Sequence, residues 1–147
     1  MDYERIERES RPHHLSRTGT TVFHALAISE SVRVVHEPVD GDPRTIATEV
    51  AVADSILSKG IGLMGRSSIP EEYALVFEFG APTTRSVHMV LVRTPIDVVW
   101  TENDEVQRVE TLAAWTGHAR GRGDKFIEMA PGAADAVEPG DRVVVEE

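Results

Sequence analysis

The run YALVFEF, residues 73–79, decides the fold class of this chain. Its side chains alternate, with Leu75, Phe77 and Phe79 on one face and Glu78 on the other. A period of two residues is typical of a β-strand, because successive side chains of a strand point to opposite faces of its sheet. The run therefore predicts a half-buried strand, ended by the Gly-Ala-Pro that follows it.

Short apolar runs of the same kind lie on both sides of this strand. Turns rich in Gly, Pro and Asp separate them, as expected for a mostly-β chain. One of them, SVHMVLV at 86–92, is apolar on both faces apart from His88 and predicts a central strand. The other predicted strands are SVRVV (31–35), IATEVAVA (46–53), IDVVWT (96–101), VQRVETL (106–112), FIEMA (126–130) and RVVVE (142–146).

Two short helices complete the prediction. Asp54 suits a helix N-cap, with Leu57, Ile61 and Met64 on one face behind it, and GAADAV (132–137) reads as one helical turn. We predict a single mostly-β domain over residues 31–147, barrel-like or jelly-roll-like. Residues 1–30 carry charges of both signs without a sustained period, which predicts a flexible N-terminal tail.

Composition restricts the function. The 147 residues include no cysteine, which excludes disulfides and a cysteine nucleophile. The net charge of −10 argues against nucleic-acid binding, since phosphates would be repelled. No run approaches the ~20 apolar residues of a membrane span, and no signal peptide is recognisable, so we expect a cytoplasmic protein. The acid excess with few lysines resembles proteins of salt-loving archaea and predicts a halophilic protein, the alternative being an ordinary acidic cytosolic one.

Several short motifs follow one another along the chain in a fixed order. They are GLMGR (62–66), LVFEF (75–79), Met89, Ile96-Asp97, Ile127-Glu128 with Gly132, and the closing PGDRV (139–143). Together they resemble domain-of-unknown-function family 192, a family of small mostly-β domains. The resemblance covers roughly residues 46–145. It departs from the family pattern at His88, where tryptophan is usual, and in the Asn-Thr that should follow Met89.

Arg66 is the main candidate for a functional residue. Its apolar neighbours predict a buried stem, and a buried guanidinium needs acceptors, for which Asp97 and Glu128 are the candidates. An internal ion pair that fixes strand register is the favoured interpretation. The alternative is an anion clamp facing a cleft.

His88 interrupts an apolar run, where histidine is more often a hydrogen-bonded core residue than a ligand. With Asp97 and Glu128 it would also supply acid–base groups or imitate a metal site, but no spacing requires either. We therefore expect no metal and no cofactor.

The remaining candidates are apolar or cationic. Met64 and Met89 suit an adaptable pocket or simply fill the core, and Trp115 suits a ligand contact or a core plug. The segment GHARGRG (117–123) reads as a glycine-rich loop whose Arg120 and Arg122 would hold phosphate or carboxylate, or only be solvated.

No catalytic signature is present, so we favour a non-enzymatic binding module for an unknown small molecule or protein. One alternative is a hydrolase- or lyase-type enzyme using His88 with Asp97 or Glu128. Another is an assembly subunit that pairs through an open strand edge.

Overall fold

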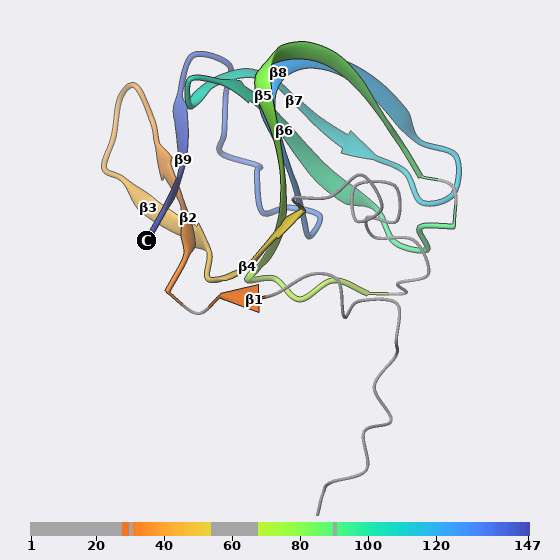
Figure 1. Ribbon diagram of the computed structural model, residues 1–147. Coiled ribbons are helices and arrows are strands. Elements are labelled where there is room, and N and C mark those ends of the chain that lie inside the picture. The colour runs from red at the N-terminus through yellow and green to blue at the C-terminus, as the bar shows by residue number, and fades with distance from the viewer. Residues whose placement is uncertain (1–27, 30, 54–67, 90) are drawn as a thin grey trace, which may run out of the picture.

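The computed structural model describes residues 28–29, 31–53, 68–89 and 91–147. They form one nine-stranded sheet in the order β1-β4-β5-β8-β6-β7-β9-β2-β3 (Figure 1). The bounds are β1 Ile28–Ser29, β2 Arg33–Glu37, β3 Arg44–Ala47, β4 Glu49–Ala53, β5 Tyr73–His88, β6 Ile96–Glu102, β7 Glu105–Leu112, β8 His118–Met129 and β9 Arg142–Glu146.

The mostly-β class is confirmed, but barrel closure is not. The sheet is open, with β1 and β3 at its two ends. Its neighbouring strands pair antiparallel except for β4 and β5, which are parallel. The predicted run 46–53 divides at Thr48 into β3 and β4, where the N–H groups of Thr48 and Glu49 both donate to the Glu72 carbonyl at 2.9 Å.

The described residues contain no helix, so neither predicted helix is confirmed. GAADAV is a series of turns, in which Asp135 N donates to Gly132 O at 3.1 Å and Val137 N to Ala134 O at 3.0 Å. The helix predicted after Asp54 lies outside the described residues. Within the described ranges, no helix has the length and apolar character of a membrane span.

The central strands are buried on both faces. Along β5, Leu75 and Phe77 belong to one hydrophobic cluster, whereas Ala74 and Val76 belong to a second cluster on the opposite face. Strands β4, β6 and β8 divide their side chains in the same way. Each large apolar side chain fully buried in such a cluster contributes about 1.5–3 kcal/mol to stability, so these strands form the core of the fold.

Strand β5 is longer than its sequence predicts. It runs from Tyr73 to His88 without interruption, so the strand end predicted at Gly80 and the central strand predicted at 86–92 are both wrong. The register with β8 shifts between Glu78 and Thr83. Such a bulge interrupts the ladder of backbone hydrogen bonds. A proline such as Pro82, which has no N–H to donate, is therefore tolerated there.

The last three strands of the sheet order, β9-β2-β3, form a unit with its own polar brace. His36 Nε2 lies 2.8 Å from Asp141 Oδ2, and both side chains are buried. The carboxylate also accepts the N–H groups of Val39 at 3.1 Å and Glu138 at 3.0 Å. Burial alone would raise the pKa of Asp141, but the hydrogen bonds from His36 and the two N–H groups outweigh it and lower that pKa.

This unit meets the rest of the sheet at one end of β7. The strands β7 and β9 pair only at Glu105 and Arg142. Next to that pair, backbone hydrogen bonds join Val106 N to Asp141 O at 2.8 Å and Val143 N to Asp104 O at 2.9 Å. The contact between the two parts of the sheet is therefore short.

Candidate functional site

Strands β5 and β8 extend beyond their other neighbours as a two-stranded ribbon. β5 pairs with β4 only over residues 73–77, and β8 pairs with β6 only over residues 125–129. β5 and β8 continue to pair with each other from Thr83 opposite Gly123 to His88 opposite His118 (Figure 1). We call residues 83–88 and 118–123 the β5–β8 ribbon.

The prediction that GHARGRG is a loop is wrong, because strand β8 begins within this segment at His118. Its glycines serve close packing. A Cβ on Gly121 would lie 2.5 Å from the indole of Trp100, and one on Gly123 would lie 2.3 Å from the Thr101 carbonyl oxygen. Glycine in a strand often marks such a close approach of another chain segment. The glycines that suggested a loop are instead explained by the close packing of strand β6 against β8.

One face of the ribbon is mostly buried, with Arg85 exposed on it above the Phe79 ring, and the other face is exposed along its whole length. On the buried face, Val87 and Ala119 belong to the first hydrophobic cluster. The exposed face, which we call the outer ribbon face, alternates with it along both strands. Its six side chains, all exposed, are Thr84, Ser86 and His88 of β5 and His118, Arg120 and Arg122 of β8.

The outer ribbon face has no carboxylate, although the chain carries a net charge of −10. Arg120 stands opposite Ser86 and Arg122 opposite Thr84. Among the described residues, no acidic group lies within ion-pairing distance of either guanidinium. Two arginines with free forks of N–H donors are suited to binding carboxylate or phosphate.

Two large hydrophobic side chains lie near the end of the ribbon. Leu91 is 50% exposed and Trp115 is 52% exposed, and both adopt positive φ, 61° and 66°. Trp115 N donates to Val92 O at 2.9 Å, which joins the loop after β5 to the turn before β8. Bulky residues at positive φ are strained, and such strain concentrates at functional sites.

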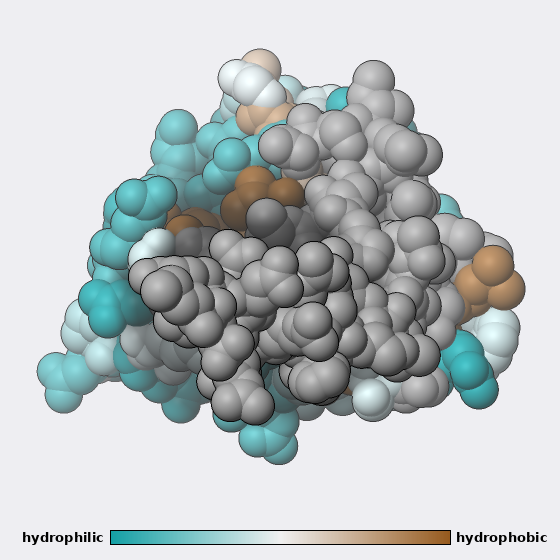
Figure 2. Space-filling view, turned by 60° about the horizontal axis from the view of Figure 1, so that its bottom comes forward, coloured by the Kyte–Doolittle hydropathy of each residue, from teal (hydrophilic) through white to brown (hydrophobic). Residues whose placement is uncertain are grey.

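Elsewhere the described surface is mostly hydrophilic. In Figure 2, hydrophobic residues show only in small separate patches among hydrophilic ones. Apart from Leu91 and Trp115, Val39 is the one large hydrophobic residue that is well exposed in the described ranges. The exposed Leu91 and Trp115 are therefore a local hydrophobic feature near the end of the ribbon.

Asp97 and Glu128, the predicted acceptors for Arg66 and partners of His88, lie on opposite faces of the sheet. Asp97 lies between Ile96 and Val98, which both belong to the first cluster, so its side chain points to the opposite face. There it accepts hydrogen bonds from Thr111 Oγ1 at 2.8 Å and from the N–H groups of Gly132 and Ala134 at 3.0 Å. Asp97 thus fastens the 132–137 turns to the sheet.

Glu128 faces the other way. Its neighbours Ile127 and Met129 belong to the second cluster, so its carboxyl lies on the face of the first cluster, opposite Leu75 and Val98. Burial raises the pKa of Glu128 from its ordinary value of 4.5 to about 8. The carboxyl is therefore protonated at neutral pH and does not share a site with Asp97.

The other predicted residues are placed as follows. Met89 is fully buried in the first cluster and fills the core. His88 is exposed on the outer ribbon face and is not the core residue that its apolar run predicted. Met64 and Arg66 lie outside the described residues, so the predicted Arg66 ion pair stays a prediction.

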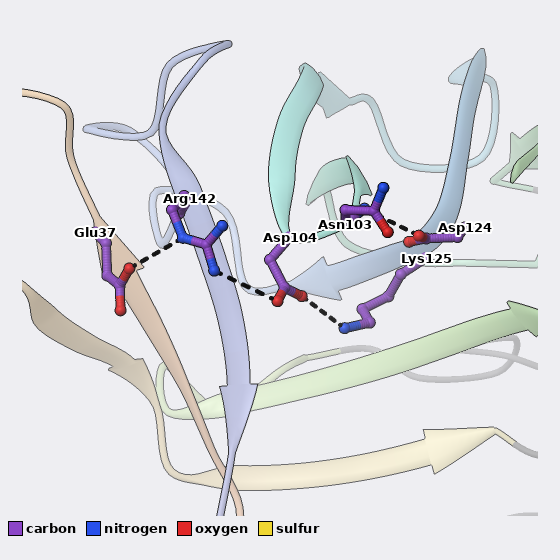
Figure 3. Close-up of polar contacts among 6 residues, drawn as sticks. All are labelled: Glu37, Asn103, Asp104, Asp124, Lys125 and Arg142. Carbon is purple, nitrogen blue, oxygen red and sulfur yellow. Dashed lines mark hydrogen bonds and ion pairs between the residues drawn. The ribbon is translucent and has the colours of Figure 1, made fainter.

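A second polar region surrounds the turn between β6 and β7 (Figure 3). Asp104 pairs with Lys125 at 3.2 Å and with Arg142 at 3.7 Å, and Arg142 also reaches Glu37 at 3.3 Å. Asn103 N donates to Asp124 at 2.9 Å. These contacts hold the turn against β8 and β9.

A pocket of 380 Å³ opens beside this turn, lined by Glu78–Pro82, Asn103, Asp104, Asp124 and Lys125. Its charged groups are mostly engaged with one another, and across the described chain no three His, Cys, Asp or Glu side chains are grouped as metal ligands. The outer ribbon face, whose arginines are not engaged in this way, is the better candidate site.

Comparison with known proteins gives the family. The model of DUF192, described as Uncharacterized ACR, matches residues 36–145. The chain belongs to the DUF192 family. No curated protein sequence matches it.

Two crystal structures share the fold. One, described as a candidate transcription regulator from Sinorhizobium meliloti 1021, has a TM-score of 0.68 at 20% identity and covers 81% of this chain and 97% of its own. The other, a protein of unknown function from Novosphingobium aromaticivorans DSM 12444, has a TM-score of 0.67 at 20% identity and covers 88% of this chain and 99% of its own. At this identity the likeness establishes the DUF192 fold alone.

Analysis of the sequence missed Thr84, Ser86 and Leu91, and it considered His118 only as part of the GHARGRG segment. His118 stands in the GHARGRG segment, but its partner His88 is thirty residues away in the chain and is brought to it only by strand register. Nothing in the sequence indicated that Leu91 is exposed, because its neighbours at 89–92 are all apolar.

Proposed function

We propose that this protein is a non-enzymatic binding module that holds a small ligand with a carboxylate or phosphate group and an apolar part. The supporting observation is the outer ribbon face, where Arg120 and Arg122 stand without a carboxylate in an otherwise acidic protein. The exposed Trp115 offers a flat apolar contact at the same end of the molecule.

The dimensions of the face suit a small molecule. Residues of a strand advance about 3.3 Å each, so His118 and Arg122 are separated by about 13 Å along β8. A carboxylate or phosphate held by Arg120 or Arg122 would leave the apolar part of a small ligand free to extend along this face toward the end of the ribbon near Trp115. The negative charge of the rest of the surface would direct an anionic ligand to this face rather than elsewhere.

The test is calorimetric titration with benzoate and phenyl phosphate, with benzamide as a neutral control. We expect the two anions to bind and benzamide to bind at least about tenfold more weakly, since a charged hydrogen bond contributes about 1.5–3 kcal/mol. Replacing both Arg120 and Arg122 by alanine should weaken anion binding at least about tenfold.

Arg44 gives the matched control, because it is an exposed strand arginine at the far end of the sheet order. Arg44→Ala should change the affinity less than about twofold, and Trp115→Ala should weaken the anions and benzamide alike. Equal losses in the Arg44 variant and the Arg120/Arg122 variant would reject the proposal, as would equal binding of benzamide and benzoate.

A further inference from the structure

We propose that His88 and His118 together form a binding site for a late divalent transition metal ion, Cu²⁺ above all. The two residues stand directly opposite each other on β5 and β8, and both are exposed on the outer ribbon face. Metal binding at this pair is separate from the proposed anion binding, because it needs neither Arg120 nor Arg122.

The register places the two rings at the closest kind of cross-strand position. Met89 N donates to Gly117 O at 2.9 Å, which puts these two residues at a hydrogen-bonding position of the ladder, although the N–H of Gly117 itself donates to Ala113 O. In an antiparallel ladder such pairs alternate with non-hydrogen-bonded pairs, whose Cα atoms are only about 4.5 Å apart and whose side chains are closer. His88 and His118 occupy the next pair, which is therefore a non-hydrogen-bonded one.

Two imidazoles at this separation can share one ion. Cβ atoms of directly opposed residues lie about 4.5–5.5 Å apart, and an imidazole nitrogen binds an ion such as zinc at about 2.0–2.1 Å. Each ring can turn toward the space between the strands, because both are exposed and neither forms a hydrogen bond or ion pair with another described residue. The remaining coordination positions would be open to water.

The chemistry of the face selects the ion. Imidazole suits zinc, copper and nickel, whereas magnesium and calcium require oxygen ligands, which a face without carboxylates does not supply. Arg120 follows His118 on the same face and repels cations. The site therefore favours the ion with the strongest bonds to nitrogen, which among the divalent first-row metals is Cu²⁺.

The experiment is titration with Cu²⁺ alone, on the full chain with His13, His14 and His24, which lie outside the described residues, replaced by alanine. We expect one ion per chain. His88→Ala and His118→Ala should each weaken binding at least about tenfold, and the double variant should be little worse than either single one, because a chelating pair fails when one ring is lost.

Arg120→Ala is the crossed control. It should leave Cu²⁺ affinity unchanged or tighten it about twofold, because it removes a repelling charge, whereas it should weaken anion binding. If Cu²⁺ binds with this pattern while benzoate does not bind, the metal site stands and the proposed anion function fails.

A spectroscopic measurement on the parent protein tests the proposal even if one of the histidine variants fails to fold. The electron paramagnetic resonance spectrum of Cu²⁺ on the parent of these variants should show two equatorial imidazole nitrogens. A spectrum with one nitrogen or none would overturn the proposal. So would a loss of affinity below about twofold in both folded single variants.

Discussion

Strand β8 has two halves that differ in what covers them. From Phe126 to Met129 every side chain is buried, and the strand is paired on both sides, by β5 and β6. From His118 to Gly123 buried and exposed residues alternate. The comparison shows that one strand has two environments: its inner half lies within the core, and its ribbon half presents one polar face to solvent.

The largest expected effect comes from the central sheet, at Asp97. Asp97→Ala should lower the free energy of unfolding by about 3–5 kcal/mol, because it removes the acceptor of three hydrogen bonds and leaves two backbone N–H groups unpaired. Urea unfolding followed by tryptophan fluorescence measures this. Thr111→Val removes only one of the three bonds and should cost about 1 kcal/mol; a similar small loss in both variants would show that Asp97 does not fasten the turns.

The second effect, also in the central sheet, depends on pH. The pKa of Glu128 is raised to about 8 in the folded protein from an ordinary value of 4.5, so the folded state holds the proton over that range while the unfolded state has released it. Stability from this group therefore falls as pH rises, by about 2–3 kcal/mol between pH 5 and pH 7 at about 1.36 kcal/mol per pH unit.

Glu128→Gln should remove this dependence. The free energy of unfolding of the variant, relative to the parent, should increase by about 2–3 kcal/mol from pH 5 to pH 7 when both are unfolded in urea. A constant difference between the two proteins would mean that the carboxyl is ionised when folded and has a cation against it, as the predicted ion pair with Arg66 requires.

The smallest effect belongs to the ribbon. Gly121→Ala should lower the free energy of unfolding by about 1–3 kcal/mol, because the new methyl group would overlap the indole of Trp100. Gly80→Ala, in the same strand pair, is the matched control, since nothing lies within 4 Å of the Cβ it would add. Equal stability of the two variants would show that the ribbon can move away from the core without cost, and the contrast between the halves of β8 would be lost.

Much of the fold was predictable from periodicity. The alternation of YALVFEF identified β5, and the runs at 96–101 and 142–146 became β6 and β9. Periodicity gave a wrong prediction where apolar residues outside a strand are buried by packing against the core. Met89 and Val92 follow the end of β5 but still belong to the first cluster, so their run resembled a central strand.

The candidate site was only partly predictable. Arg120, Arg122, His88 and Trp115 were recognised as residues that can bind, and the structure places the first three on one face. Their arrangement depends on the register of two strands far apart in the sequence, which no local pattern specifies. Which face of the sheet the side chains of Asp97 and Glu128 point to depends on the exact register of their strands. A shift of one residue would move each side chain to the opposite face.

The short contact between β7 and β9 divides the sheet into two hydrogen-bonded ladders that share the second hydrophobic cluster. Strands β2, β3 and β9 form one ladder and the remaining strands form the other. Separating the two would break few backbone hydrogen bonds, but it would expose the side chains of Val34, Ala47 and Val143, which are buried in the shared cluster. Amide hydrogens of the smaller unit would then exchange with solvent together, and earlier than those of β5 and β8. A ligand held on the β5–β8 ribbon would slow exchange in the larger unit and leave the smaller one unchanged.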